Sequence, residues 1–191
     1  MELIFDLKIK ECPQEKIPDT GYSLRSPQTM STAAQSNIIF TGNSIQIPAI
    51  GLGMETPIPI VHVYYVGETF ENGWDLTMLG GYVGELEGGA YIPYSGNAVL
   101  TGHYYSQGVF VNLNGLKLED EIIVYATDGM KYIYKVNNSF YTKPNDVWQL
   151  FQPNGEKSLT LVTCDSYNLV TDEYDKRYVV MAVLDHSEPY Q

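Results

Sequence analysis

Short runs rich in apolar residues, some of them alternating with polar residues, recur along most of this chain. They occupy residues 44–48, 58–66, 97–102, 120–127, 130–140, 159–164 and 177–184. Side chains of a β-strand point alternately to its two faces, so a period of two predicts strands. Asp128-Gly129 separates two of the runs and is a strong signal for a tight hairpin turn. About eight short strands with few helices favour an all-β fold, an eight-stranded closed β-barrel.

Helical segments are expected to be few and short. Residues 74–79 predict one or two helical turns that end at Gly80-Gly81, and residues 145–151 predict a short helix with Asn145 as its N-cap. Residues 109–116 are compatible with a short helix or a 3₁₀ turn. The glycine-rich residues 80–96 predict a surface loop with short extended pieces.

The first 43 residues differ from the rest of the chain. Residues 11–43 are rich in Pro, Ser, Thr, Gln and Asn and have neither helical nor strand periodicity. They predict an irregular N-terminal extension or linker, to which residues 3–9 would add one short strand. We therefore expect an extension over residues 1–43 and a barrel domain over residues 44–186.

Composition and charge exclude several functions. With 44% hydrophobic and 18% charged residues the chain is globular. A net charge of −12 disfavours nucleic-acid backbones and anionic membrane surfaces as partners. No stretch approaches the ~18 continuous apolar residues of a membrane helix. Residues 1–10 lack the basic start and long apolar core of a signal peptide.

The chain contains two cysteines, Cys12 and Cys164. Their number permits one disulfide, but Cys12 lies in a polar, proline-flanked stretch far from the main strand pattern. We therefore expect Cys164 to be unpaired. No C-x-x-C spacing occurs, so we expect no metal site.

Three reactive side chains each stand beside an apolar run. Cys164 ends the run 159–164, His103 follows Thr-Gly at the end of the run 97–102, and Arg177 opens the last run. A thiol, a base and a permanent cation are the minimum parts of a cysteine acyl-transfer site. Each residue also has an ordinary structural interpretation: a buried packing cysteine, a hydrogen-bonded core histidine, and an arginine paired with an acidic residue of the preceding loop (Asp172, Glu173 or Asp175).

Together these motifs resemble the sortases, the cysteine transpeptidases of bacterial cell surfaces. The matching pieces are Thr-Gly-His at 101–103, Leu-Thr-Leu-Val-Thr-Cys at 159–164 and Arg-Tyr-Val-Val-Met-Ala-Val-Leu at 177–184. Ser-Ile-Gln-Ile-Pro-Ala-Ile from Ser44 is similar to the opening strand of the family, and residues 110–124 are similar to its Phe-x-x-Leu segment. The resemblance spans about residues 43–184.

The resemblance implies a mechanism and its partners. Cys164 would attack the Thr–Gly bond of a C-terminal sorting signal of the LPxTG or LAxTG type, and a thioacyl enzyme would form. His103 would protonate the leaving amine and deprotonate the incoming one, and Arg177 would hold substrate and oxyanion. The acceptor would be an amine of peptidoglycan or of a pilin, and no cofactor is expected. The substrate pocket is expected to include Thr163, Trp74, Leu79 and Trp148.

The chain departs from the class B pattern because a long insertion before the catalytic strand is absent, so it is more similar to class D or E. The resemblance implies an extracytoplasmic enzyme at the bacterial surface, tethered in the full-length protein by a segment that this sequence does not show. The acidic residues 165–176 predict a solvated loop, with a weak Ca²⁺ contact as the alternative. Papain-like enzymes have Cys before His, the reverse of the order here. A catalytically silent barrel that binds peptides is the rival from another class.

Overall fold

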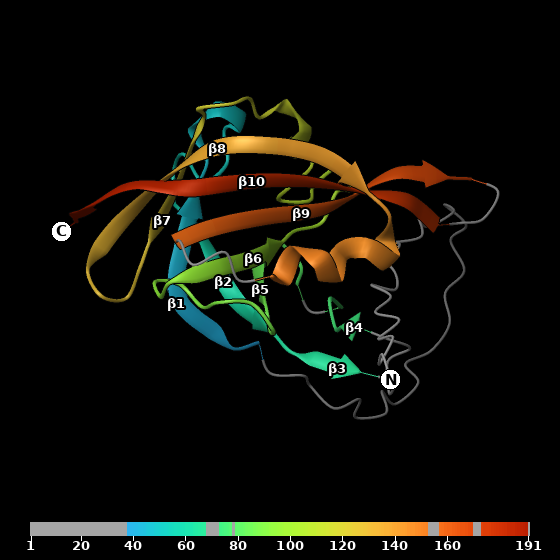
Figure 1. Cartoon of the computed structure of the whole chain (residues 1–191), viewed down its shortest axis with the longest axis horizontal. Helices are drawn as coiled ribbons and strands as arrows, with labels where there is room; N and C mark the ends of the chain where they lie inside the picture. The colour runs from blue at the N-terminus through green and yellow to red at the C-terminus, as the bar shows by residue number, and fades with distance from the viewer. Residues whose placement is uncertain (1–37, 68–72, 78, 153–156, 170–172, 191) are drawn as a thin grey trace, which may run out of the picture.

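The computed structural model describes residues 38–67, 73–77, 79–152, 157–169 and 173–190. At its centre, eight strands close a barrel in the order β1-β2-β5-β6-β9-β10-β8-β7 (Figure 1). Their bounds are β1 (Phe40–Gln46), β2 (Ile58–Val63), β5 (Val83–Leu86), β6 (Gly96–Thr101), β7 (Glu121–Tyr125), β8 (Met130–Thr142), β9 (Lys157–Asn168) and β10 (Glu173–Pro189). The prediction of an eight-stranded closed barrel is confirmed.

Smaller elements lie against the barrel. β3 (Tyr65–Gly67) and β4 (Gly73–Trp74) pair as a separate antiparallel sheet. Three short 3₁₀ helices are described: η1 (Pro48–Ile50), η3 (Leu113–Gly115) and η4 (Pro144–Phe151). η4 contacts β6 and β10 and lies outside the barrel, next to β6 and β9 in Figure 1.

The predicted hairpin is confirmed between β7 and β8, which pair antiparallel around Asp128-Gly129. The Asp128 carboxylate accepts the Met130 N–H at 3.0 Å. Gly129 has φ of 79°, a left-handed conformation that glycine adopts without a steric penalty. Turn chemistry in the sequence therefore fixes the register of this pair.

Two local predictions are wrong. Trp74, predicted to begin a helical turn over residues 74–79, pairs with Tyr65 in a strand and stacks on Phe151, with ring centroids 4.9 Å apart. The turn is confined to the end of the segment, where the Leu79 N–H donates to the Leu76 carbonyl oxygen at 3.1 Å. Asn145 does not cap η4, because the helix starts one residue earlier at Pro144 and the N-cap position belongs to Lys143. Proline suits the first helical turn because its missing N–H would have no partner there.

The division into an extension over residues 1–43 and a domain over residues 44–186 stays a prediction. The first barrel strand, β1, begins at Phe40, a few residues before the predicted start of the domain. β10 continues to Pro189, beyond the predicted end at residue 186. The short strand predicted over residues 3–9, like Cys12, lies outside the described residues.

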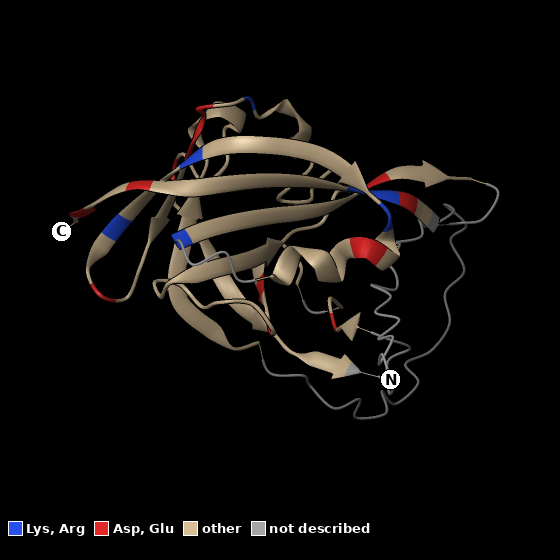
Figure 2. Ribbon diagram, in the orientation of Figure 1, with Lys and Arg blue, Asp and Glu red and all other residues tan. Residues whose placement is uncertain are grey.

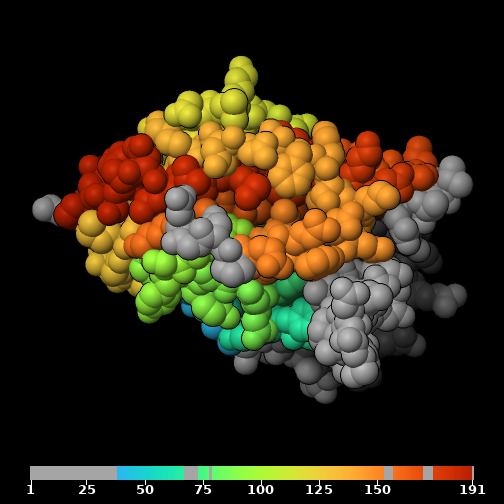
Figure 3. All heavy atoms as spheres, viewed as in Figure 1, coloured from blue at the N-terminus to red at the C-terminus, as the bar shows by residue number. Residues whose placement is uncertain are grey.

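Three strands carry apolar side chains on both faces. Alternate residues of β6, β9 and β10 pack into two different clusters: Leu100, Leu161 and Val180 join the first, while Val99, Val162 and Val179 join the second. The second cluster also holds Val147 and Leu150 of η4, and Trp74 of β4. These three strands therefore form a region of the sheet with an apolar cluster on each face. Figure 3 shows β8 and β10 side by side on the surface of the molecule, next to η4. Rigid, doubly buried strands of this kind hold the residues at their ends in fixed positions.

Candidate active site

The barrel topology brings His103, Cys164 and Arg177 to one end. β6 and β9 are parallel, with Thr101 opposite Val162, so both strands end on the same side. β10 runs antiparallel to β9 and places Arg177 directly opposite Cys164. Adjacent strands lie about 4.8 Å apart. Residues separated by up to 74 positions (177 − 103) in the sequence therefore meet at one barrel end.

Thr163 ties the ends of β6 and β9 together. Its hydroxyl donates a hydrogen bond of 2.7 Å to the Gly102 carbonyl oxygen, and its side chain is buried. This bond lies one residue before His103 on one strand end and one residue before Cys164 on the other. The bond therefore places His103 and Cys164 at the same height along the two neighbouring strands. The predicted contact between Thr163 and substrate stays a prediction.

All three reactive residues are buried, with exposed fractions of 3% for His103, 4% for Cys164 and 4% for Arg177. Buried polar and charged groups are rare unless partners stabilise them. Burial also strengthens electrostatic interactions between them, because little water screens the charges. This setting suits chemistry in which charge develops during the reaction.

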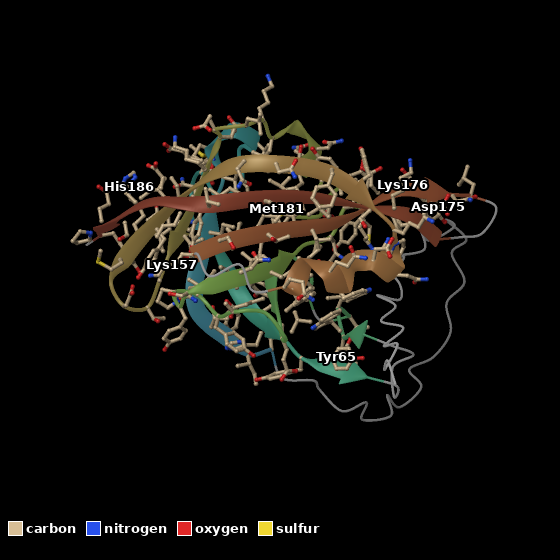
Figure 4. All side chains as sticks on the ribbon, viewed as in Figure 1. Tyr65, Lys157, Asp175, Lys176, Met181 and His186 are labelled. Carbon is tan, nitrogen blue, oxygen red and sulfur yellow. The ribbon has the colours of Figure 1, made fainter. Side chains whose placement is uncertain are left out.

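Main-chain carbonyl groups orient the Arg177 guanidinium. Its Nη1 donates to the carbonyl oxygens of Tyr174 and Lys176, both at 3.0 Å. Asp175, one of the acidic partners considered above, accepts a hydrogen bond of 3.1 Å from Asn168. Figure 4 shows Asp175 and Lys176 at the barrel end opposite to Lys157 and His186, and Figure 2 shows basic and acidic positions close together there. These two carbonyl groups fix the direction of the Arg177 guanidinium at the end of the barrel that also holds Cys164.

His103 stands directly after β6, and its backbone carbonyl accepts the Phe110 N–H at 3.1 Å. Its imidazole ring lies against the ring of Tyr105, with centroids 5.0 Å apart. Burial lowers the pKa of His103 below its ordinary value, because the charged imidazolium is less well solvated. The neutral form is therefore favoured near neutral pH. The other two histidines lie elsewhere: His62 sits on β2 and His186 near the end of β10.

Cys164 is disulfide-bonded in this structure, so the expectation that it is unpaired is wrong. The chain's other cysteine, Cys12, lies outside the described residues. The prediction relied on the separation of the two cysteines in sequence. The entropy of closing a loop grows only slowly with its length, so that separation does not exclude a bond. A nucleophilic Cys164 requires the reduced protein.

A comparison with known domain families assigns the chain to one of them. The Sortase domain family model matches residues 45–185 of the chain. The chain belongs to the sortase family. It is similar to the Sortase A of Staphylococcus aureus (strain NCTC 8325 / PS 47), with 34% identity over 74 residues, 38% of this chain and 35% of that protein. It is also similar to the Sortase A of Bacillus anthracis, with 36% identity over 87 residues, 44% of this chain and 39% of that protein.

The matched segments thus span well under half the length of these two curated relatives. A solved structure covers more of the sortase fold. The Sortase D5 transpeptidase of Clostridium perfringens aligns with a TM-score of 0.58 and 29% identity, over 75% of this chain and 78% of that one. The comparison supports the barrel and the placement of its strands along most of the domain.

Tyrosines surround the site of this sortase, and sequence reasoning missed their arrangement. The ring of Tyr174 contacts those of Tyr104 and Tyr167, at 6.3 and 5.1 Å between centroids. Tyr141 packs on Tyr178 and donates a long hydrogen bond of 3.4 Å to Asp165. Burial and the nearby Asp165 raise the pKa of Tyr141. The signal in the sequence was the high count of 16 tyrosines, which by itself assigns no position.

A buried asparagine, also missed, attaches η4 to the barrel. The Asn97 amide donates to the Leu150 carbonyl oxygen, and its own oxygen accepts hydrogen bonds from Ser158 and Thr160. These bonds join η4 to both β6 and β9. The sequence did contain a signal for this contact: Asn97 is a polar residue in an apolar run. A buried amide needs hydrogen-bond partners, so such a position predicts bonds to neighbouring elements.

The predicted pocket residues fall into two groups. Trp74 and Leu79 are buried in the second cluster, where they contact protein. Trp148 lies on η4 and is 40% exposed, so its side chain can contact a ligand. The three were grouped by sequence neighbourhood, which does not reveal the direction of a side chain. Their contact with substrate stays a prediction.

Within the described residues, no group of three His, Cys, Asp or Glu side chains could hold a metal ion. Asp172, one of the acidic residues considered for Ca²⁺, lies outside them. Across the same part of the chain, no helix has the length and apolar character needed to cross a membrane.

Proposed function

We propose that this sortase is a cysteine transpeptidase that cuts a C-terminal sorting signal of the LPxTG or LAxTG type between Thr and Gly. The acyl group then passes to an amine of peptidoglycan or of a pilin at the bacterial surface. The observation that carries the proposal is the register at one barrel end. Arg177 of β10 lies opposite Cys164 of β9, and the Thr163–Gly102 bond aligns His103, which follows β6. The missing long insertion before the catalytic strand supports a class D or E type of enzyme.

The reaction begins from the reduced protein. The Cys164 thiolate attacks the carbonyl carbon of the signal's Thr, and a tetrahedral oxyanion forms. Arg177, oriented by the Tyr174 and Lys176 carbonyl groups, stabilises that negative charge. Guanidinium suits this role because it keeps its charge and presents a planar set of donors.

His103 handles the protons of both half-reactions. As imidazolium it donates a proton to the glycine nitrogen when the C–N bond breaks, and a thioester with Cys164 remains. The neutral imidazole then takes a proton from the acceptor amine as that amine attacks the thioester. The C–S bond breaks, the new amide leaves, and the Cys164 thiolate and protonated His103 return. Because burial lowers the pKa of His103, the reactive ion pair is a minor form of the enzyme.

The direct test uses fluorogenic peptides with LPxTG and LAxTG sequences, an amine acceptor, and reduced protein. We expect wild type to cleave at least one peptide of the panel and to form the amine-linked product, identified by mass spectrometry. Cys164→Ala should show only background cleavage and no thioacyl adduct. Cys12→Ser is the matched control, because it removes the other cysteine and should keep activity. Equal behaviour of wild type and Cys164→Ala on every peptide would favour the silent peptide-binding barrel.

A further inference from the structure

The imidazole of His103 lacks the carboxylate partner that orients many catalytic histidines. Within the described residues, no hydrogen bond or ion pair reaches its ring nitrogens, and burial alone displaces its pKa. His103 is 3% exposed, so packing by neighbouring side chains, and not a hydrogen bond, sets the rotation of the ring about its two side-chain bonds. A base that serves both half-reactions needs a defined ring orientation. Something other than a hydrogen bond must therefore hold this ring.

The ring of Tyr105 is placed to do so. It lies 5.0 Å from the His103 ring, centroid to centroid, with 33° between the planes. Aromatic pairs prefer such offset or tilted arrangements over a face-to-face stack. Tyr105 is 37% exposed, so its ring contacts the imidazole without joining the barrel core.

The backbone of the loop fixes Tyr105 in turn. The Tyr105 carbonyl oxygen accepts the Gly108 N–H at 2.6 Å, and the Phe110 N–H returns to the His103 carbonyl oxygen. A Cβ atom at Gly108 would stand 2.2 Å from that oxygen, so the close return of the chain requires glycine. The loop from His103 to Phe110 is thus closed by two hydrogen bonds, and Tyr105 lies inside it.

We propose that Tyr105 is the positioning residue of His103: its ring orients the imidazole and stabilises the imidazolium that protonates the leaving amine. This inference rests on the transpeptidase function proposed above. An aromatic face attracts a cation, whereas burial acts against the charge of His103. Other charged or titratable groups beside His103 are Arg177 on β10, Cys164 on β9 and Tyr104 in its own loop.

Two substitutions separate the ring from the hydroxyl. Tyr105→Phe keeps the ring, whereas Tyr105→Leu keeps the apolar volume and loses the π-face. The control is Tyr94→Leu, a strongly exposed tyrosine at a different part of the surface. In Tyr105→Leu we expect the pKa of His103 to fall by about 0.5, because the lost attraction between cation and ring no longer favours the imidazolium. Proton NMR of the reduced protein measures this pKa directly among the three histidines.

The kinetic readout uses the same proteins. Tyr105→Leu should lower kcat roughly threefold to tenfold with little change in KM, and move the acid limb of the pH–kcat/KM profile to lower pH. Tyr105→Phe and Tyr94→Leu should match wild type in both measurements. A merely structural loop residue would change stability without moving the acid limb.

The outcomes also distinguish this inference from the proposed function. If wild type is active and Tyr105→Leu has the wild-type His103 pKa and acid limb, Tyr105 is only a surface residue and the inference is overturned. If no peptide is cleaved by wild type, the proposed function fails, and the NMR titration still decides whether the ring stabilises the imidazolium. Circular dichroism of each variant confirms that the barrel is intact.

Discussion

Burial acts in opposite directions on two titratable side chains of neighbouring strands. After β6, it lowers the pKa of His103 and favours the neutral base. On β5, which pairs with β6, it raises the pKa of Glu85 from 4.5 to about 7 and favours the neutral acid. In both cases water is removed from the charged form. The sign differs because protonation charges one group and neutralises the other.

The surroundings of the two groups explain their different roles. Glu85 is 1% exposed, its Oε1 accepts the Ile92 N–H at 3.0 Å, and its Oε2 lies 3.6 Å from His62 Nδ1. These contacts attach the segment after β5 to the barrel wall. His103 instead has an aromatic neighbour and an opposing strand end with a thiol. A backbone hydrogen bond thus holds the Glu85 carboxyl group in place, whereas an aromatic ring contacts the His103 imidazole.

The largest expected effect on activity comes from reducing the disulfide bond of Cys164, at the barrel end that also holds His103. Protein in which Cys164 is disulfide-bonded has no thiolate there and should be inactive. Treatment with a dithiol reductant should restore activity, with the reductant taking up the disulfide. Peptide cleavage and alkylation of Cys164, followed by mass spectrometry, measure this. Cys12→Ser should be active without reductant. Full activity of the untreated wild type, with immediate alkylation of Cys164, would show that the thiol is free in solution.

Arg177→Lys should have the next largest effect. Lysine keeps a positive charge but loses the planar donors that two carbonyl groups orient, so we expect kcat/KM to fall about 100-fold or more. The thermal midpoint should stay near that of wild type. Lys157→Gln, at the opposite end of the barrel in Figure 4, is the control for loss of a cation and should keep activity. Near-normal activity of Arg177→Lys would exclude a specific guanidinium role.

The smallest effect on activity, but a clear effect on stability, is expected for Glu85→Gln. Because the folded pKa of Glu85 is about 7 and the unfolded one is about 4.5, this group's contribution is fully present below pH 4.5 and is lost as pH rises through 7. The loss approaches about 3 kcal/mol. Glutamine keeps an acceptor for the Ile92 N–H without the charge. The variant should therefore exceed wild type in unfolding free energy at pH 8, and peptide cleavage should change little.

Denaturant titrations from pH 4 to 8 measure this difference, with the exposed Glu55→Gln as the control. Parallel stability curves for wild type and Glu85→Gln would show that Glu85 ionises normally in the folded state. In that case the contrast with His103 would not hold.

The same contrast shows what a sequence can predict. The strand that leads to His103 and the strand that carries Cys164 were predicted because each is an apolar or alternating run, although β9 continues to Asn168, beyond its predicted end at Cys164. The Asp128-Gly129 turn was predicted because its residues prefer one backbone conformation. Family motifs then indicated the three reactive residues. Each of these signals is local in the sequence.

The remaining features depend on contacts across the fold. Trp74 became a strand residue because Tyr65 and Phe151 pack on it, and neither contact is encoded near residue 74. Glu85 was not singled out, since nothing in a glycine-rich segment indicates that its carboxylate is buried. The ring contact of Tyr105 with His103 also needs the loop closed by Gly108. The oxidation state of Cys164 cannot be deduced from spacing either.

The parallel pairing of β6 with β9 has a consequence for biosynthesis. Parallel neighbours require a long connection. Here residues 102–156 carry β7, β8 and η4 before β9 can dock beside β6. Contacts of such high sequence separation form late in folding. A chain emerging from the ribosome therefore exposes His103 long before Cys164 is translated. The reactive pair comes together only when the barrel closes, so catalytic competence should be acquired last and partly folded chains should not cleave peptides.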